Sequence, residues 1–355
     1  ESSKTKNNQT DNDDLYKIYW EDTKMEFSAT AGTAGGSLKA LFEVRDGDNL
    51  ENFKGKVTKA DSYSLTVENI SIDNIKSLNL PDKDGKITVN NISYSYDSWE
   101  AQVDAQGNIK SVTFNLSKDK AIADPEKTVA EGYLLNAGSA INARGIPYYM
   151  TQLNEFVRNF SEMFNQIESK GQNLNGDTPP TFFEAITNTA KVYDFSESEA
   201  YSKLPDGQTA TINSSSNTYY RMTAANFSVN KDVMNDVSLF ATSTDYVKTD
   251  SCDIVDELKK LQSEKTVYRG DKAESFLETI ISNVSVDTEK AETYNKLYSN
   301  LEQTIANQRT SVSGVDEDEE ALNLVKFQYS YNMASKIISV MNQMLDKLIN
   351  DTGVA

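Results

Sequence analysis

The sequence contains no histidine and a single cysteine, and it is poor in glycine and proline, with 16 and 6 among 355 residues. Without histidine the chain cannot build a Ser-His-Asp or Cys-His catalytic group, nor a histidine-containing zinc site. Cys252 has no second cysteine with which to close an intramolecular disulfide. These absences predict a protein that is not an enzyme and that holds no cofactor and no metal ion.

The excess of negative charge and the lack of long apolar runs exclude two further classes of partner. Asp and Glu number 54 against 35 Lys and Arg, which gives a formal net charge of −19. Nucleic acid and an anionic membrane surface would both be repelled by such a chain. The sequence also has no run of 18 apolar residues, so no helix is expected to span a membrane. We therefore expect neither nucleic acid nor a membrane as a partner.

The N-terminal end is polar and does not read as a cleavable signal peptide, so we expect none at the start of this sequence. The first residue is Glu1 rather than methionine, and the first fourteen residues are all polar. We predict a disordered tail over residues 1–14, and we expect the chain to be a piece of a longer protein.

What the sequence does have is heptad periodicity near its C-terminal end. Apolar residues recur there at alternating steps of three and four, which is the a/d pattern of a coiled-coil seam. Ile337, Met344, Met333 and Val340 flank the pattern, so the apolar face is broader than a two-stranded coiled coil requires. We predict that this face is an interface for other polypeptides. The predicted interface residues are Leu324, Phe327, Tyr331, Ala334, Ile338, Met341, Leu345 and Leu348.

The beginning of this predicted helix is acidic. Ser313 fits an N-cap, and five consecutive acidic residues follow at 316–320, where carboxylates complement the helix dipole. The acidic cluster lacks the glycine and the alternating ligand spacing of a calcium loop. A solvated helix start is therefore a better interpretation than a cation site.

Two other segments show the same three-and-four periodicity. One extends from Ile146 to Ile167, with Pro147 in a position that suits the first helical turn. The other extends from Ala291 to Val312. Together with the terminal segment, they predict long helices at 147–170, 287–312 and 313–350.

Between about residues 50 and 138 the periodicity changes from helical to strictly alternating. Runs such as KITVNNISYSYD and IKSVTFNLS are separated by turn dipeptides, which predicts an antiparallel β domain. Tyr94, Tyr96 and Trp99 in this region admit two interpretations. Core packing is favoured because aromatic side chains on strands are mostly buried, and a sugar-binding platform is the alternative.

Together these patterns predict an α+β multidomain protein. Long heptad-patterned helices would form a helical bundle or coiled-coil body, with an inserted antiparallel β domain and further short β segments. The predicted regions are a disordered tail over 1–14, a discontinuous mainly helical body of 15–47 with 141–175 and 221–312, an inserted β domain over 48–140, a β/loop segment over 176–220 and a terminal helix over 313–355.

Several stretches, in the same order, resemble one family of flagellar axial proteins. Residues 311–351 resemble the C-terminal signature of such proteins. Residues 35–47 and 146–166 resemble the Gly-Gly-x-Leu segment and the following long helix of the hook-associated protein 1 family, the first hook–filament junction proteins. Residues 171–183 and 224–243 resemble further stretches of that family. Here residues 48–144 separate the first two stretches, and the family's N-terminal helix is missing, which predicts a fragment.

The resemblance implies a structural subunit of the bacterial flagellum at the hook–filament junction. Such a subunit is secreted by type III export, functions in motility outside the cell, and assembles through coiled-coil helices. The implied partners are other flagellar axial proteins, namely the hook protein and the second junction protein, further copies of the chain in a ring, and a cytoplasmic export chaperone on the terminal axial-type helix.

Three alternatives stay open at this point. In the first, the apolar face of the terminal helix packs into an ordinary core within the same chain. In the second, the β domain makes the protein a surface-exposed adhesin or glycan-binding module carried on a flagellar-type scaffold. In the third, the abundant carboxylates form a hydrolase site, which requires two of them about 5–10 Å apart in a pocket.

Overall fold

The computed structural model contains both helices and antiparallel sheets, so the predicted α+β class is confirmed. It separates into two units, Glu1–Ile280 and Ile281–Ala355. The structure describes residues 2–6, 14–118, 121–122, 125, 129, 131–187, 189–248, 250–264 and 266–351.

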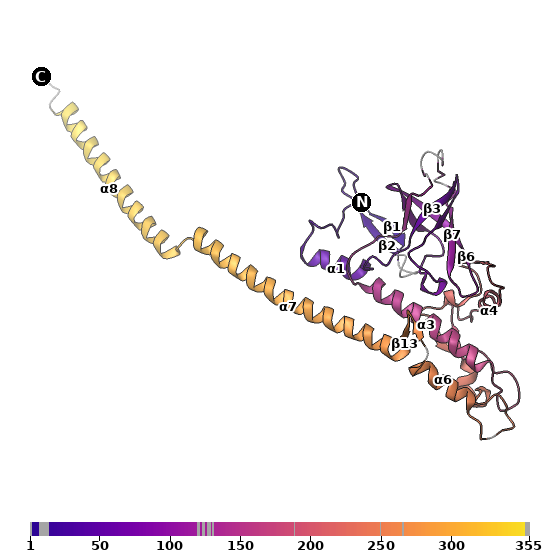
Figure 1. The fold of residues 1–355 in the computed structure, drawn as a ribbon. Coiled ribbons are helices and arrows are strands. Elements are labelled where there is room, and N and C mark those ends of the chain that lie inside the picture. Colours follow the sequence, from indigo (N-terminus) through magenta and orange to yellow (C-terminus); the bar gives the residue numbers. More distant parts are fainter. Residues whose placement is uncertain are drawn as a thin grey trace. The chain divides into compact units, whose positions relative to one another are not determined.

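The first unit is built around a closed antiparallel barrel of six strands (Figure 1). The strands follow the order β6-β5-β8-β3-β4-β7, and β7 pairs back with β6 to close the barrel. Closure leaves no unpaired edge strand in the ring. The antiparallel β structure predicted for this region is therefore confirmed. The strands are β3 (Lys54–Asp61), β4 (Ser64–Glu68), β5 (Gly85–Val89), β6 (Ile92–Val103), β7 (Ile109–Leu116) and β8 (Leu134–Ala137).

Aromatic side chains of β6 and β7 fill the barrel. Tyr96 and Phe114 are fully buried, with their ring centroids 5.1 Å apart. Tyr94, two residues before Tyr96 on the same face of the strand, is buried as well. Trp99 is buried because a register shift between Tyr96 and Ser98 returns it to the inner face. The alternative that Tyr94, Tyr96 and Trp99 form a surface sugar platform is therefore wrong, since all three belong to the core.

A segment far along the chain completes the same core. Strand β10 (Ala210–Asn213) pairs antiparallel with β6, with Ile212 opposite Ala101. Tyr201, in α4 (Ser196–Ser202), and Tyr220, in η3 (Tyr219–Arg221), are buried among the barrel residues. Two stretches that the sequence predicts as distinct regions thus share one hydrophobic core.

The chain enters and leaves the barrel region at a single point. Asp48 and Arg144 form an isolated antiparallel bridge, and the amide of Gly145 donates to the carbonyl of Gly47 at 3.0 Å. A Cβ on either glycine would overlap backbone atoms of the neighbouring segments. This contact joins the end of α1 (Gly36–Asp46) to the start of α3 (Ile146–Glu168), as expected for an insertion between two helices.

Helix α3 has packed neighbours on two sides. Its apolar residues meet α6 (Asp253–Ser263) and the first turns of α7 (Ala273–Ser313), where the rings of Phe156 and Phe276 stack at 5.5 Å. On its other side α3 meets the 3₁₀ turn η1 (Ile75–Ser77) and the residues that follow it. A short hairpin, β12 (Thr266–Tyr268) with β13 (Asp271–Lys272), connects α6 to α7.

The remaining elements of the first unit are short. Within the tail predicted over 1–14, residues 1 and 7–13 lie outside the described residues, whereas Ser2–Lys6 pair with a following strand. The remaining short elements of the first unit are β1 (Ser2–Lys6), β2 (Asp14–Ile18), β9 (Phe183–Ala185), β11 (Phe227–Val229), α5 (Lys231–Asn235) and η4 (Val237–Leu239).

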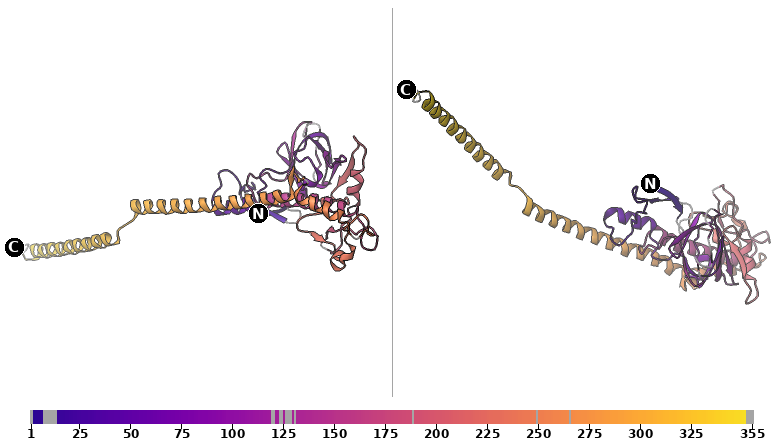
Figure 2. Two further views of the ribbon diagram at one scale, coloured as in Figure 1. Left: turned by 60° about the horizontal axis from the view of Figure 1, so that its bottom comes forward. Right: turned by 90° about the horizontal axis from the view of Figure 1, so that it is seen from above.

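The C-terminal part of the chain consists of two long helices, α7 (Ala273–Ser313) and α8 (Glu317–Asn350), separated by three residues (Figure 2). The prediction of Ser313 as the N-cap of the terminal helix is wrong, because α7 continues to this residue. Gly314 follows in tight contact with Thr310, where a Cβ would overlap the Thr310 carbonyl oxygen. The cap of α8 is Asp316.

Candidate assembly surface

All eight predicted interface residues lie on α8, and all of them are exposed. The seven large side chains among them are 49–75% exposed, with Tyr331 at the upper end and Leu345 at the lower. Steps of three and four place them along one stripe of the helix. The structure therefore assembles them into one continuous surface, which we call the α8 stripe. Within the described residues, no other part of the chain buries any residue of α8.

Apolar side chains outside the α8 stripe are exposed on this helix as well. Leu322, Val325, Tyr329 and Ile349 are also exposed, beside Met333, Ile337, Val340 and Met344 that the sequence had indicated as flanking positions. These four lie outside the a/d positions, so a search for heptads does not find them. The signal that identifies them is the overall apolar content of the segment, which is higher than one seam needs.

The first turn of α8 explains why this segment forms a helix without a neighbour. The carboxylate of Asp316 accepts hydrogen bonds from the amides of Asp318 (3.0 Å) and Glu319 (3.3 Å). Four acidic residues occupy the first turn and Lys347 the last, which matches the helix dipole at both ends. No glycine or proline interrupts the 34 residues between them.

Helix α7 carries a second exposed apolar stripe. Tyr294, Tyr298, Leu301 and Ile305 are at least half exposed. If the three-and-four steps of α7 are continued past Val312, they reach positions 315, 319, 322 and 326. The α8 stripe instead begins at Leu324, two residues before position 326. The break at 314–316 therefore shifts the heptad register by two residues, or about 200° around a continuous helix. Without the break, the two stripes would lie on nearly opposite faces of one helix.

The energetic argument for a partner rests on the size of the α8 stripe. Burying a large apolar side chain contributes about 1.5–3 kcal/mol, so the seven large residues represent about 10–20 kcal/mol before entropic costs. Soluble monomers rarely expose contiguous apolar patches of more than a few hundred Å². The predicted coiled coil is not present within the described chain, because α8 has no buried residue. Pairing of α8 with another polypeptide stays a prediction.

The structure offers little support for a chemical site in the described residues. They contain no group of three or more His, Cys, Asp or Glu side chains placed to hold a metal ion. Cys252 is exposed and unbridged. Among these residues no helix combines the length and the apolar character needed to cross a membrane.

Comparison with known proteins gives two matches, and the first covers the candidate surface. Residues 306–351 match the family model described as "Flagellar basal body rod FlgEFG protein C-terminal". This segment begins in the last turns of α7 and includes all of α8.

The second match covers nearly the whole chain. Over 341 residues, or 94% of this chain, the sequence is 21% identical to "Flagellar hook-associated protein 1" of Bacillus subtilis (strain 168). The chain spans 56% of the length of that relative. The two similarities, one at the C-terminal helix and one along the chain, support a flagellar structural role for this chain as a hook-associated protein.

Proposed function

We propose that the protein is a structural subunit of the hook–filament junction of the bacterial flagellum. It is secreted by type III export and assembles outside the cell through coiled-coil contacts of α8. It performs no catalysis in this role, and it needs no cofactor. The adhesin alternative has lost its basis, because Tyr94, Tyr96 and Trp99 are buried.

The observation that carries the proposal is the coincidence of two features on one segment. The residues that match the flagellar rod family model, 306–351, include the whole of the exposed α8 stripe. An apolar stripe of this size requires a cover, and an axial assembly in which helices of many subunits pack together provides one.

The proposed partners follow from the same surface. The α8 stripe contacts other flagellar axial proteins, namely the hook protein and the second junction protein, and further copies of the chain in a ring. Before export, an uncovered stripe is an aggregation hazard, so a cytoplasmic chaperone binds the same residues. The eight residues from Leu324 to Leu348 therefore have successive partners.

The proposal is tested by placing charges on the stripe. Leu324→Asp with Ile338→Asp puts two carboxylates at a positions, where burial against a partner would cost several kcal/mol each. The matched control is Asn332→Asp with Ser339→Asp, which adds the same two charges at b positions on the polar side of α8. Both variants are expressed as the full protein in the source bacterium lacking its own copy of the gene.

The proposal predicts that the stripe variant gives hooks without attached filaments and non-motile cells, whereas the control variant swims normally. Electron microscopy of the hooks and a swimming assay in soft agar measure the two effects. Circular dichroism and thermal unfolding of the purified variants check that the first unit stays folded. Normal filaments and motility in the stripe variant would refute the assembly role of α8.

A further inference from the structure

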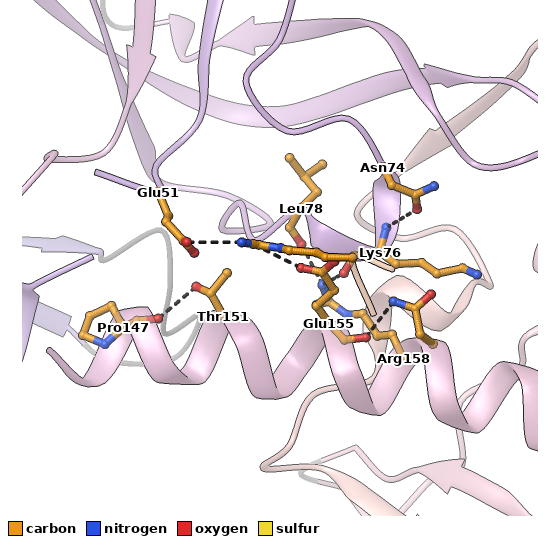
Figure 3. Close-up of polar contacts among 10 residues, drawn as sticks. Glu51, Asn74, Lys76, Leu78, Pro147, Thr151, Glu155 and Arg158 are labelled. Carbon is orange, nitrogen blue, oxygen red and sulfur yellow. Dashed lines mark hydrogen bonds and ion pairs between the residues drawn. The ribbon is translucent and has the colours of Figure 1, made fainter. Parts of the chain in front are cut away.

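A polar cavity of about 620 Å³ lies in the first unit, between the barrel region and α3. Its walls come from four segments: residues 50–52 before β3, residues between 71 and 77 after β4, residues between 151 and 159 of α3, and the turn of the β12–β13 hairpin. Figure 3 shows Glu51 on one side of this region and Thr151 and Glu155 of α3 on the other. The cavity is lined by residues of the first unit alone and has no part in the proposed function.

The lining of the cavity is acidic. Glu51, Asp73 and Glu155 contribute three carboxyl groups, and Arg269 in the hairpin turn contributes the guanidinium among the lining residues. Burial raises the pKa of Glu155, and a hydrogen bond from Ser77 and the charge of Arg269 act against that rise. A cavity with more carboxylates than cations attracts positively charged ligands.

Arg269 makes only long contacts with the carboxylates of Glu51 and Glu155. Its guanidinium lies 3.3 Å from Glu51 and 3.5 Å from Glu155, whereas charge-assisted hydrogen bonds are about 2.7–2.9 Å long. Its side chain is 49% exposed, so solvent weakens both of these contacts. Arg269 is therefore a loosely held cation that a better-placed one can replace.

Two buried acceptors in the same wall lack hydrogen-bond partners among the described residues. They are Oε2 of Glu51 and Oδ1 of Asn52. Asn52 is 2% exposed, and its amide nitrogen is already used by the Ala137 carbonyl at 3.3 Å. A buried acceptor without a donor costs about 1–3 kcal/mol, so this wall favours a ligand that brings donors.

The floor of the cavity suits a cation as well. The ring of Tyr268 is buried, and the Arg269 guanidinium carbon lies 5.0 Å from its centroid, within the range of a cation–π contact. Burial, followed by the charge of Glu155, holds the pKa of Tyr268 well above its usual range, so its hydroxyl stays neutral. The site thus combines carboxylates, unpaired acceptors and an aromatic face.

We propose that this cavity binds a primary ammonium or guanidinium group. Such groups carry only donors and a positive charge, which is what Glu51, Asn52 and the Tyr268 ring require. The group comes either from a free amine or from a lysine or arginine side chain of another polypeptide.

Isothermal titration calorimetry of the full chain at low salt tests the proposal with two probes. Spermidine represents a free amine, and N-acetyl-lysine methylamide represents a side chain. N-acetyl-norleucine methylamide has nearly the same shape without the charge and serves as the control ligand. We expect saturable 1:1 binding of at least one charged probe and none of the control ligand. Binding of spermidine alone identifies a free amine as the source, and binding of the lysine analogue identifies a side chain.

Two variants locate the binding. Glu51→Gln removes one carboxylate without changing shape and is expected to weaken binding at least tenfold. Asp61→Asn, an exposed carboxylate at the opposite end of β3 from Asn52, is the matched control and leaves affinity unchanged. Arg269→Gln removes the competing cation and is expected to tighten binding severalfold. Absence of binding to both the native protein and Arg269→Gln, or equal binding by Glu51→Gln, would overturn the proposal.

Discussion

Helices α3 and α8 carry the same three-and-four apolar periodicity, yet their surroundings are opposite. Twelve of the 23 residues of α3 are buried, whereas none of the 34 residues of α8 is buried among the described residues. Most of the buried residues of α3 are polar, because the barrel side covers the face opposite its apolar stripe. The periodicity therefore predicts a helix with an apolar face, and it carries no information about what covers that face.

The largest expected effect contrasts two phenylalanines. Phe114 is fully buried in the barrel, and Phe327 is 74% exposed on α8. Phe114→Ala leaves a cavity and is expected to lower the free energy of unfolding of the first unit by about 3–5 kcal/mol. Phe327→Ala removes no packed contact in the chain and should change it by less than about 0.5 kcal/mol.

Urea unfolding followed by tryptophan fluorescence measures this pair, because Trp99 lies in the barrel core. Equal destabilisation by the two substitutions would show that α8 is folded onto the first unit in solution. That result would break the comparison on which the proposed function depends.

The next effect concerns the polar face of α3. Arg158 is 1% exposed and donates to the carbonyls of Met222 (2.8 Å), Lys76 (2.9 Å) and Leu78 (2.7 Å). Its guanidinium also lies over the Tyr220 ring at 4.7 Å. Arg158→Met keeps much of the volume but leaves buried carbonyls without donors, so we expect a loss of about 3 kcal/mol.

Urea unfolding of Arg158→Met measures the loss in the free energy of unfolding. Arg309→Met is the control, since Arg309 is exposed on α7. A loss below about 1 kcal/mol for Arg158→Met would mean that the barrel and α3 do not depend on this side chain for their contact.

The next effect is a pH dependence of the free energy of unfolding, caused by a buried carboxyl group at the end of α3. Burial raises the pKa of Glu168, at the end of α3, from its usual 4.5 to about 7, and a hydrogen bond from the Ala241 amide limits the rise. The folded protein then holds this proton up to about pH 7, while the unfolded chain releases it near pH 4.5. The free energy of unfolding therefore falls as pH rises between these values, by on the order of 2–3 kcal/mol.

Glu168→Gln keeps the acceptor for Ala241 and removes the ionisation. We expect this variant to be more stable than the native protein at pH 8 and nearly equal to it at pH 4.5. Urea unfolding at several pH values between 4.5 and 8 measures the difference. An unchanged slope in Glu168→Gln would assign the pH dependence to another group.

The smallest effect lies at the start of α8. Asp316→Ala removes the side-chain acceptor for the amides of Asp318 and Glu319, which costs about 1 kcal/mol of helix stability at that end. Hydrogen–deuterium exchange of residues 317–322 should become about fivefold faster. Ser313→Ala is the control, because Ser313 belongs to α7, and faster exchange in this control would restore Ser313 as the cap.

Much of the local structure could be predicted from the sequence. The three-and-four steps identified α3, the later part of α7 and α8, and the alternation around Ile87 and Phe114 identified the antiparallel strands. The same pattern placed the eight predicted interface residues on α8, where they are exposed, and their role as an interface stays a prediction. The resemblance to the hook-associated family rested on five stretches outside the β domain, and a flagellar hook-associated role is supported by the two similarities.

The rest depended on contacts between residues distant in the chain. The insertion of β8 between β5 and β3, and the addition of β10 to β6, leave no trace in local periodicity. A one-residue register shift decides that Trp99 points inward, and the nearby barrel decides that Arg158 is buried. The charged cavity around Glu51 and Arg269 also requires segments more than 200 residues apart.

Local periodicity was enough to locate the long helices and the barrel strands and to identify their apolar faces, because side-chain periodicity follows directly from the geometry of each backbone conformation. Which of those faces are covered became known from the packing of the folded chain. Burial depends on which distant segments meet. For that reason the apolar stripe of α3 packs against α6 and the first turns of α7, whereas the stripe of α8 has no cover among the described residues.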